Sequence, residues 1–240
     1  MKILKDVCRF QILTPKDELE AQFLRIEKAG RTCYQSENKE ITKRTAEKFV
    51  RMLMRSNHES VIEHSSMTVR FINVSRGFTH ELVRHRLASF SQESTRYVDY
   101  AKRGKGVDLE EFEMQFIMPP RRDKHQKILL EDGRTVFPED MAIEFEMYYR
   151  GLRKAGWLPE EARQFLPIGI KSEIIISANF REWRHVFALR TAKPAHWEIR
   201  GVMGELLKEV RKIVPIVFDG FMEEGVDSKG VPFFTLAEKL

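Results

Sequence analysis

The chain has 240 residues, of which 42% are apolar and 32% are charged, and its mean hydropathy is −0.41. This composition excludes a disordered or collagen-like chain and is typical of a soluble globular protein with one large domain or two small ones. The net charge of +5, from 41 basic and 36 acidic residues, is spread along the chain, so it suits small anionic ligands as well as a nucleic-acid partner.

The two cysteines, Cys8 and Cys33, form no C-x-x-C pair. Two thiols exclude a disulfide scaffold and a four-thiolate metal site, and they fit a reducing cytoplasm. No stretch reaches the roughly 18 apolar residues that a membrane span needs. We therefore expect a cytoplasmic protein with no export signal and no membrane anchor.

Apolar spacing in the first part of the chain predicts both strands and helices. In chain order, we expect a strand over residues 2–13, a helix from Asp17 to about Gly30, a helix from Thr42, a strand over residues 65–72 and a helix capped by Ser75. The last helix would bring Arg84 and Arg86 out at its C-terminal end.

Proline and glycine divide the second part of the chain into clear segments. We expect a strand over residues 111–118, a surface excursion with a turn near Gly133, a helix from Pro138 to Gly156, a short helix from Pro159, a strand over 170–178, a helix from Asn179 to about Arg190 and a long helix after Pro194. Asn179 followed by Glu182 has the form of a capping box.

These elements predict one mixed α/β domain over residues 1–240. The chain has no internal repeat and no Ser/Gly linker, and its only compositional dip is at residues 101–108. Helices and strands do not alternate strictly enough for a doubly wound parallel sheet.

Arg84 to Tyr97 is the densest cluster of anion-binding and hydroxyl groups, with three arginines, His85 and three serines. Guanidinium groups bind phosphate or carboxylate oxygens in pairs, so this cluster could hold a multiply charged ligand. The serines favour turns and predict an irregular segment after a helix. The alternative interpretation is a solvated basic surface.

The order Arg84-His85-Arg86, Ser89, Ser94 and Arg96 reproduces R-H-R-x-x-S-x-x-x-x-S-x-R, which fixes six identities in thirteen positions. This pattern resembles the signature of the flavin-dependent thymidylate synthases. The resemblance implies a central, mostly antiparallel sheet flanked by helices, and a homotetramer with active sites between subunits.

Residues His58 to His64 also invite a metal interpretation, but the six-residue spacing does not put both rings on one helix face. A polar helix-to-strand turn is the simpler interpretation. This H-E-[ST]-x-x-E-H stretch is similar to the family's flavin-contacting segment, in which Ser60 would touch the cofactor.

Two later segments extend the resemblance. Ala162 to Pro167 is similar to the family's A-R-x-x-L-P element, in which Arg163 would reach the nucleotide, although such an arginine is usually a solvated charge. The N-x-R helix from Asn179 would meet flavin first and the pyrimidine through Arg190. His185 stands where relatives often carry Asn, and Glu81 where some carry Gln.

The resemblance implies a set of contacts for each ligand. Flavin contacts are expected from Ser60, Arg84, His85, Arg86, Gln92, Asn179, Phe180, Arg181 and His185. Nucleotide contacts are expected from Glu81, Leu82, Val83, Arg84, Gln92, Glu93, Ser94, Thr95, Arg96, Arg163 and Arg190.

The activity that the resemblance implies is reductive methylation of dUMP to dTMP. Methylenetetrahydrofolate would supply the carbon, NADPH would reduce FAD, and the reduced flavin would supply the hydride. Arg190 is the candidate catalytic residue because a guanidinium at O2 or N3 would stabilise an enolate-like ring. Ser94 is expected to bind rather than attack, since no base is evident beside it.

Two other functions remain open at this stage. A nucleic-acid-binding module would use the arginines on phosphates, yet the basic residues are dispersed among acidic ones. A metal-dependent hydrolase would rest on His58, His64 and His80. G-x-S-x-G, P-loop and G-x-G-x-x-G motifs are all absent from the sequence. We expect no metal and no nucleic-acid partner.

Overall fold

The computed structural model describes residues 1–33, 35–36, 40–101, 113–228 and 230–237. These residues have a mixed α/β fold and divide into two compact units, each assembled from distant parts of the sequence. Unit 1 comprises Met1–Arg9, Phe71–His80 and Gln92–Ile174. Unit 2 comprises the described residues of Phe10–Arg70, Glu81–Ser91 and Ile175–Leu240. None of the described helices is long and apolar enough to cross a membrane.

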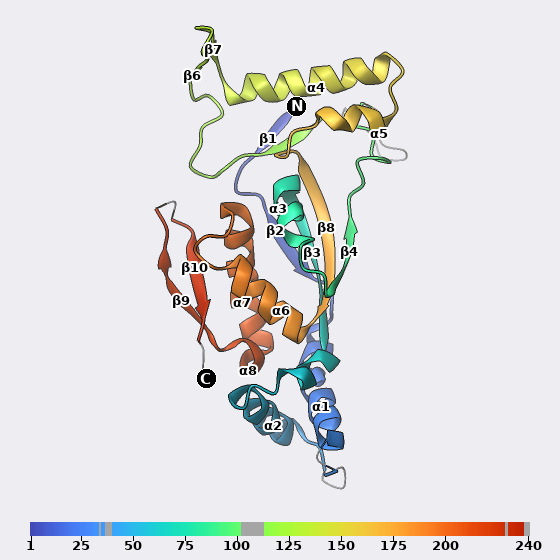
Figure 1. The fold of residues 1–240 in the computed structure, drawn as a ribbon, viewed down its shortest axis with the longest axis vertical. Coiled ribbons are helices and arrows are strands. Elements are labelled where there is room, and N and C mark those ends of the chain that lie inside the picture. Colours follow the sequence, from blue (N-terminus) through green and yellow to red (C-terminus); the bar gives the residue numbers. More distant parts are fainter. Residues whose placement is uncertain (34, 37–39, 102–112, 229, 238–240) are drawn as a thin grey trace. The chain divides into compact units, whose positions relative to one another are not determined.

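The largest sheet has four strands in the order β2-β3-β8-β4 (Figure 1). Their bounds are Arg9–Ile12 for β2, Ser66–Ser75 for β3, Lys171–Asn179 for β8 and Ala88–Gln92 for β4. In β3 the predicted alternation is confirmed, because Met67, Val69 and Phe71 are fully buried while Thr68 is half-buried. Alternate side chains of a strand point to opposite faces, so one face of β3 belongs to the core.

Unit 1 is built around two small sheets and one long helix. Its elements are β1 (Lys2–Leu4), β5 (Gln115–Ile117), β6 (Ile128–Leu129), β7 (Thr135–Val136), α4 (Pro138–Lys154), α5 (Pro159–Ala162) and the 3-10 helix η2 (Arg163–Phe165). Strands β1 and β5 pair in parallel, and β6 and β7 form an antiparallel hairpin. The core contains Tyr100, Met114, Phe116, Tyr149 and Ile170.

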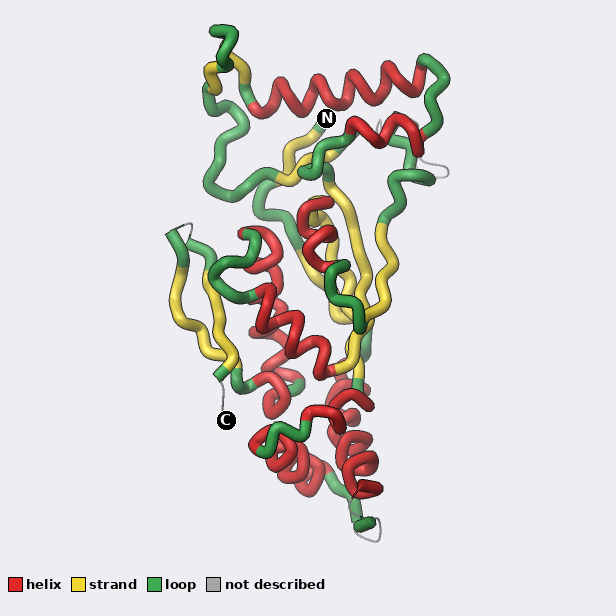
Figure 2. Tube along the Cα trace, in the orientation of Figure 1, coloured by secondary structure: helices red, strands yellow, loops and turns green. Residues whose placement is uncertain are grey.

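Unit 2 is mainly helical (Figure 2). Its elements are α1 (Lys16–Cys33), α2 (Lys43–Arg55), the 3-10 helix η1 (Glu59–His64), α6 (Phe180–Arg190), α7 (Trp197–Ile213), α8 (Pro215–Phe218), β9 (Phe221–Val226) and β10 (Pro232–Leu236). Phe187 lies at the centre of its aromatic core, with ring centroids 5.5 Å from Trp183 and 5.6 Å from Phe218. Trp183 Nε1 also donates to the Met67 carbonyl oxygen at 2.9 Å, which satisfies the buried indole.

Helix α3 (Arg76–Leu82) and α6 begin where the sequence predicts. Ser75 Oγ accepts a hydrogen bond from the Phe78 amide at 3.0 Å, and Asn179 Oδ1 accepts one from the Glu182 amide at 2.8 Å. These bonds satisfy amide groups that a helix N-terminus leaves unpaired. At the end of α4, Gly156 has a φ of +96°, which confirms the predicted stop.

Two predicted segments are wrong in detail. Residues 2–13 form β1 and β2 rather than one strand, and Asp6 between them has a φ of +53°, which breaks the extended backbone. Ser89 and Ser91 lie in β4 instead of an irregular loop, because pairing with β8 outweighs the local preference of serine for turns. Most of the compositional dip at 101–108 lies outside the described residues, as do residues 111–112 of the strand that is described from Gln115.

The last forty residues, which add no motif to the family resemblance, contain a hairpin anchored on α7. Strands β9 and β10 pair antiparallel, and β10 lies beside α7 in Figure 1. The Phe234 amide donates to the Thr191 carbonyl oxygen at 3.0 Å. A Cβ at Gly204 of α7 would lie only 3.0 Å from the Phe234 ring, so glycine permits this close approach.

Candidate functional site

A pocket in unit 2 gathers most of the predicted flavin residues. Its volume is about 820 Å³, within the range of small-molecule and cofactor sites. It is lined by Glu59, Glu63, Arg84, His85, Arg86, Leu87, Asn179, Arg181, Glu182, Arg184, His185, Ala188 and Leu236. Helix η1, the segment after α3, helix α6 and strand β10 therefore each supply part of the wall.

The arginines of this pocket differ in whether a carboxylate already holds them. Arg181 Nη1 lies 2.5 Å from Glu63 Oε1, and Arg184 Nε donates to Glu59 Oε1 at 3.1 Å. Arg84 and Arg86 are exposed and form no ion pair within the described part of the chain. Their two guanidinium groups are therefore available to an anionic ligand.

His85 is the buried centre of the pocket wall, with 3% of its surface exposed. Its Nε2 accepts a hydrogen bond from Arg190 Nε at 2.9 Å, and its Nδ1 lies 3.4 Å from Glu182 Oε1. Burial lowers the pKa of His85 from 6.5 to about 4, with smaller contributions from the positive charge of Arg190 and from His185. The imidazole is therefore neutral at pH 7.

His85, Glu182 and His185 place potential metal ligands within 4.8 Å of one another. Nδ1 of a neutral imidazole can bind a metal only if Nε2 carries the proton. Here Nε2 faces an N–H group of Arg190, so it must be the lone-pair nitrogen. The hydrogen bonding of this cluster thus opposes metal binding, and His58 and His64 are not part of the cluster.

Arg190, the predicted catalytic residue, occupies the last turn of α6. Its side chain is 15% exposed, and Nη1 pairs with Glu81 Oε2. Arg190 is therefore held from two directions, by the Glu81 carboxylate and by the imidazole of His85. The family resemblance predicts a nucleotide contact for Glu81, but it does not predict this ion pair.

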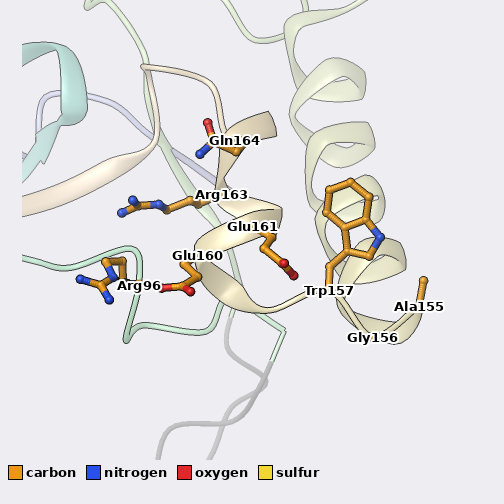
Figure 3. Close-up of a pocket in the computed structure, with 8 residues that line it drawn as sticks. All are labelled: Arg96, Ala155, Gly156, Trp157, Glu160, Glu161, Arg163 and Gln164. Atoms are coloured by element: carbon orange, nitrogen blue, oxygen red, sulfur yellow. Dashed lines mark hydrogen bonds and ion pairs between the residues drawn. The ribbon is translucent and has the colours of Figure 1, made fainter.

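Two of the predicted nucleotide residues of unit 1, Arg96 and Arg163, line a second pocket of about 780 Å³ (Figure 3). Figure 3 shows Arg96 and Arg163 on one side of the α5 segment and Trp157 on the other. Arg96 Nε lies 3.1 Å from Glu160 Oε2, and Arg163 Nη1 donates to Thr95 Oγ1 at 3.2 Å. Thr95 is buried, so it fixes the direction of the Arg163 side chain.

A smaller pocket of about 360 Å³ in unit 1 shares Arg163 and Gln164 with the second pocket and adds Arg76, His80 and Thr95. Arg76 Nη1 donates to the Glu93 carbonyl oxygen at 3.2 Å. Burial lowers the pKa of Arg76. Arg76 is not predicted from the sequence, because a single arginine at the start of a helix carries no distinguishing spacing.

Several predicted residues direct their side chains away from the pockets. Phe180 is fully buried and stacks edge-on against Phe218, and Leu82 is also fully buried. The Glu93 carboxylate accepts from Tyr100 Oη at 3.1 Å and from Lys171 Nζ at 3.0 Å. In addition, Gln92 Nε2 donates to Thr79 Oγ1, while Ser60 and Val83 are exposed and do not line the unit 2 pocket.

Ser94 stabilises a turn of its own segment. Its Oγ accepts a hydrogen bond from the Arg96 amide at 3.2 Å, and its carbonyl oxygen accepts one from the Val98 amide at 2.9 Å. Within the described residues, no side-chain base donates to or accepts from this hydroxyl. This geometry is typical of a serine that shapes a binding loop.

Comparison with known sequences places this site in a family. Residues 17–216 match the family described as thymidylate synthase complementing protein. The flavin-dependent thymidylate synthase of Pyrococcus furiosus is 36% identical over 180 residues, which cover 74% of this chain and 68% of the relative. That of Clostridium tetani is 34% identical over 210 residues, which cover 79% and 78%.

Solved structures share the fold at lower sequence identity. A UMP/dUMP methylase, PolB, from Streptomyces cacaoi bound with 5-Br dUMP aligns with a TM-score of 0.62 and 23% identity over 91% of this chain and 96% of that one. Thymidylate synthase X from Helicobacter pylori with FAD and dUMP aligns with a TM-score of 0.59 and 21% identity over 88% and 97%. With its motifs, its fold and the family match over residues 17–216, the chain belongs to the flavin-dependent thymidylate synthase family.

Proposed function

We propose that this chain catalyses the reductive methylation of dUMP to dTMP with FAD as its cofactor, methylenetetrahydrofolate as carbon donor and NADPH as reductant. Membership of the family supports the reaction. The single observation that carries the proposal is the unit 2 pocket, which brings together the predicted flavin residues Arg84, His85, Arg86, Asn179, Arg181 and His185.

The chemistry of this pocket fits a flavin dinucleotide. Arg84 and Arg86 would bind its doubly charged pyrophosphate, because both guanidinium groups are exposed and free of carboxylate partners among the described residues. Asn179 and His185 would contact polar ring edges from the first turns of α6. When bound, the reduced flavin supplies the hydride.

Arg190 would act on the pyrimidine. A guanidinium beside O2 or N3 stabilises the negative charge that the ring gains as C5 becomes nucleophilic. Because Glu81 and His85 both hold the Arg190 side chain, little reorganisation is needed when that charge develops. Ser94 would serve binding, since its hydroxyl oxygen already supports a turn.

In unit 1, Arg96, Thr95 and Arg163 would hold the nucleotide. Arg96 is exposed and lies over the ring of Tyr97, and the one carboxylate paired with it among the described residues is the exposed Glu160, so a phosphate could displace that weak partner. Arg163 is preset by its hydrogen bond to buried Thr95. The remaining predicted contacts, from Leu82, Val83, Gln92 and Glu93, would use backbone atoms where their side chains are engaged or buried.

We propose a cytoplasmic homotetramer in which each chain is a single domain with a mostly antiparallel central sheet, and in which subunits share active sites. Helix α4 supports an assembly surface, because Met141, Ile143, Met147 and Tyr148 are all exposed on it. Light scattering should give a mass four times the chain mass of 28.3 kDa. A fully active monomer would contradict the assembly.

The colour and product of the purified protein test the function. We expect a yellow protein that absorbs in the flavin bands and forms dTMP from dUMP only when methylenetetrahydrofolate and NADPH are both supplied. UMP as substrate measures the selectivity for the sugar. A colourless protein that binds oligonucleotides with strong salt dependence would instead support the nucleic-acid-binding alternative.

A further inference from the structure

Arg190 is oriented by a neutral imidazole as well as by a carboxylate. The Nε of Arg190 donates to His85 Nε2 at 2.9 Å, and every nitrogen of a guanidinium is a donor only. Nε2 of His85 must therefore carry the lone pair. In a neutral ring the proton then lies on Nδ1, so the hydrogen-bond pattern assigns the Nδ1–H tautomer.

The carboxylate of Glu182 lies within reach of that Nδ1–H group. The distance from Nδ1 to Glu182 Oε1 is 3.4 Å, and the two side chains are 2% and 6% exposed. The sequence suggests that Glu182 closes a capping box, but only the Asn179 half is found, with Oδ1 accepting from the Glu182 amide. The Glu182 carboxylate instead faces the ring of His85.

Glu182 and Arg190 belong to the same helix and lie eight residues apart, about 12 Å along its axis. His85 comes from the segment after α3 and contacts both of them. A rigid helix thus presents the carboxylate and the guanidinium to opposite nitrogens of one buried ring. Among the described residues, a further titratable neighbour of that ring is His185, whose ring centroid is 5.5 Å away.

We propose that Glu182 is a positioning residue that acts through His85 on Arg190. The carboxylate keeps the imidazole protonated on Nδ1, so Nε2 remains an acceptor that fixes the direction of the Arg190 guanidinium. Without an acceptor at Nδ1, the ring gains the Nε2–H tautomer, and that N–H group faces an N–H group of Arg190. Arg190 then loses its fixed direction. This inference rests on the proposed role of Arg190.

Kinetics of Glu182 variants test the proposal. Glu182→Leu should lower kcat for dTMP formation by about tenfold, the effect of losing roughly one hydrogen bond. The dUMP KM and the rate of flavin reduction by NADPH should stay unchanged. Glu182→Gln should restore most of the activity, because its amide oxygen still accepts from Nδ1–H. Glu205→Gln, an exposed glutamate on α7 paired with Lys208, is the matched control.

A second background separates positioning from general structural damage. In His85→Gln the amide oxygen can accept a hydrogen bond from Arg190, and an amide has no tautomers for Glu182 to select. Adding Glu182→Leu to this variant should therefore lower kcat by less than about twofold. If Glu182→Leu lowered kcat equally in the wild type and in His85→Gln, or lowered the rate of flavin reduction in parallel, the proposal would be overturned.

Histidine ¹⁵N spectra of the flavin-bound wild type provide a readout independent of turnover. They should show the His85 resonance, assigned with His85→Gln, as the Nδ1–H tautomer, and Glu182→Leu should shift it towards Nε2–H. A wild-type Nε2–H tautomer would overturn the proposal. If the wild type makes no dTMP but the tautomer depends on Glu182, the proposed function fails while the link from Glu182 to His85 stands.

Discussion

Arg86 offers the sharpest test of the flavin pocket, because no carboxylate among the described residues competes for its charge. If Arg86 binds the cofactor pyrophosphate as proposed, replacing it with alanine removes a charge-assisted hydrogen bond worth about 1.5–3 kcal/mol. The dissociation constant of FAD should therefore rise about 10- to 150-fold.

Arg181 provides the internal comparison. Its Nη1 is 2.5 Å from Glu63 Oε1, and both side chains are about half exposed. A phosphate that recruits Arg181 must weaken this pair, which is worth about 0–1 kcal/mol at such exposure. The dissociation constant of FAD should therefore rise less in Arg181→Ala than in Arg86→Ala. The two variants should differ in this constant by up to about fivefold.

The assay is titration of apoprotein with FAD, followed by flavin fluorescence at constant ionic strength. Arg44→Ala, an exposed arginine on α2 outside the pocket, is the matched control. Arg86 and Arg44 are both exposed, so neither Arg86→Ala nor Arg44→Ala should change the unfolding free energy by more than about 0.5 kcal/mol. Full flavin occupancy in Arg86→Ala, or the same change in Arg86→Ala and Arg44→Ala, would refute the assignment of the pyrophosphate to this arginine.

Three further outcomes follow from the site. Arg190→Ala should lower kcat and kcat/KM together by about 10²- to 10³-fold while flavin reduction survives, and a rise in dUMP KM alone would contradict its catalytic role. Ser94→Ala should keep measurable methylation and raise the dUMP KM by up to about tenfold, whereas an inactive Ser94→Ala with an active Ser94→Cys would establish a nucleophile. Because burial lowers the pKa of His85 to about 4, the folded protein binds fewer protons than the unfolded chain between pH 6.5 and 4. The unfolding free energy should then fall by about 3 kcal/mol from pH 7 to pH 4 through this group, and urea titrations of His85→Gln should lack that part of the slope.

Side-chain alternation and helix capping predict those strands and helices whose own residues show these patterns. The alternation of Met67, Val69 and Phe71 marked β3, and Asn179 marked the start of α6, because side-chain period and capping are short-range properties. The same patterns predict a loop for Ser89 and Ser91, because they do not show the pairing of β4 with β8, which lies about eighty residues away in the sequence.

The candidate site was predictable to the extent that a family pattern covers it. That pattern named Arg84, His85 and Arg86, which the structure places in one pocket. It did not indicate that Glu63 neutralises Arg181 or that Glu182 faces His85, since both contacts join residues about a hundred positions apart. The capping-box pattern predicts that the Glu182 carboxylate bonds the start of its own helix. The sequence does not show that this carboxylate lies beside the ring of His85 instead.

The hairpin β9–β10 has a practical consequence for selective inhibition. Leu236 of β10 lines the unit 2 pocket, yet it lies beyond residues 17–216, the part that matches the family. A compound that contacts Leu236 in this pocket would depend on a part of the wall that the family pattern does not specify. Its potency against this chain would then differ from its potency against relatives, and exchanging the hairpin between two such enzymes should transfer that difference.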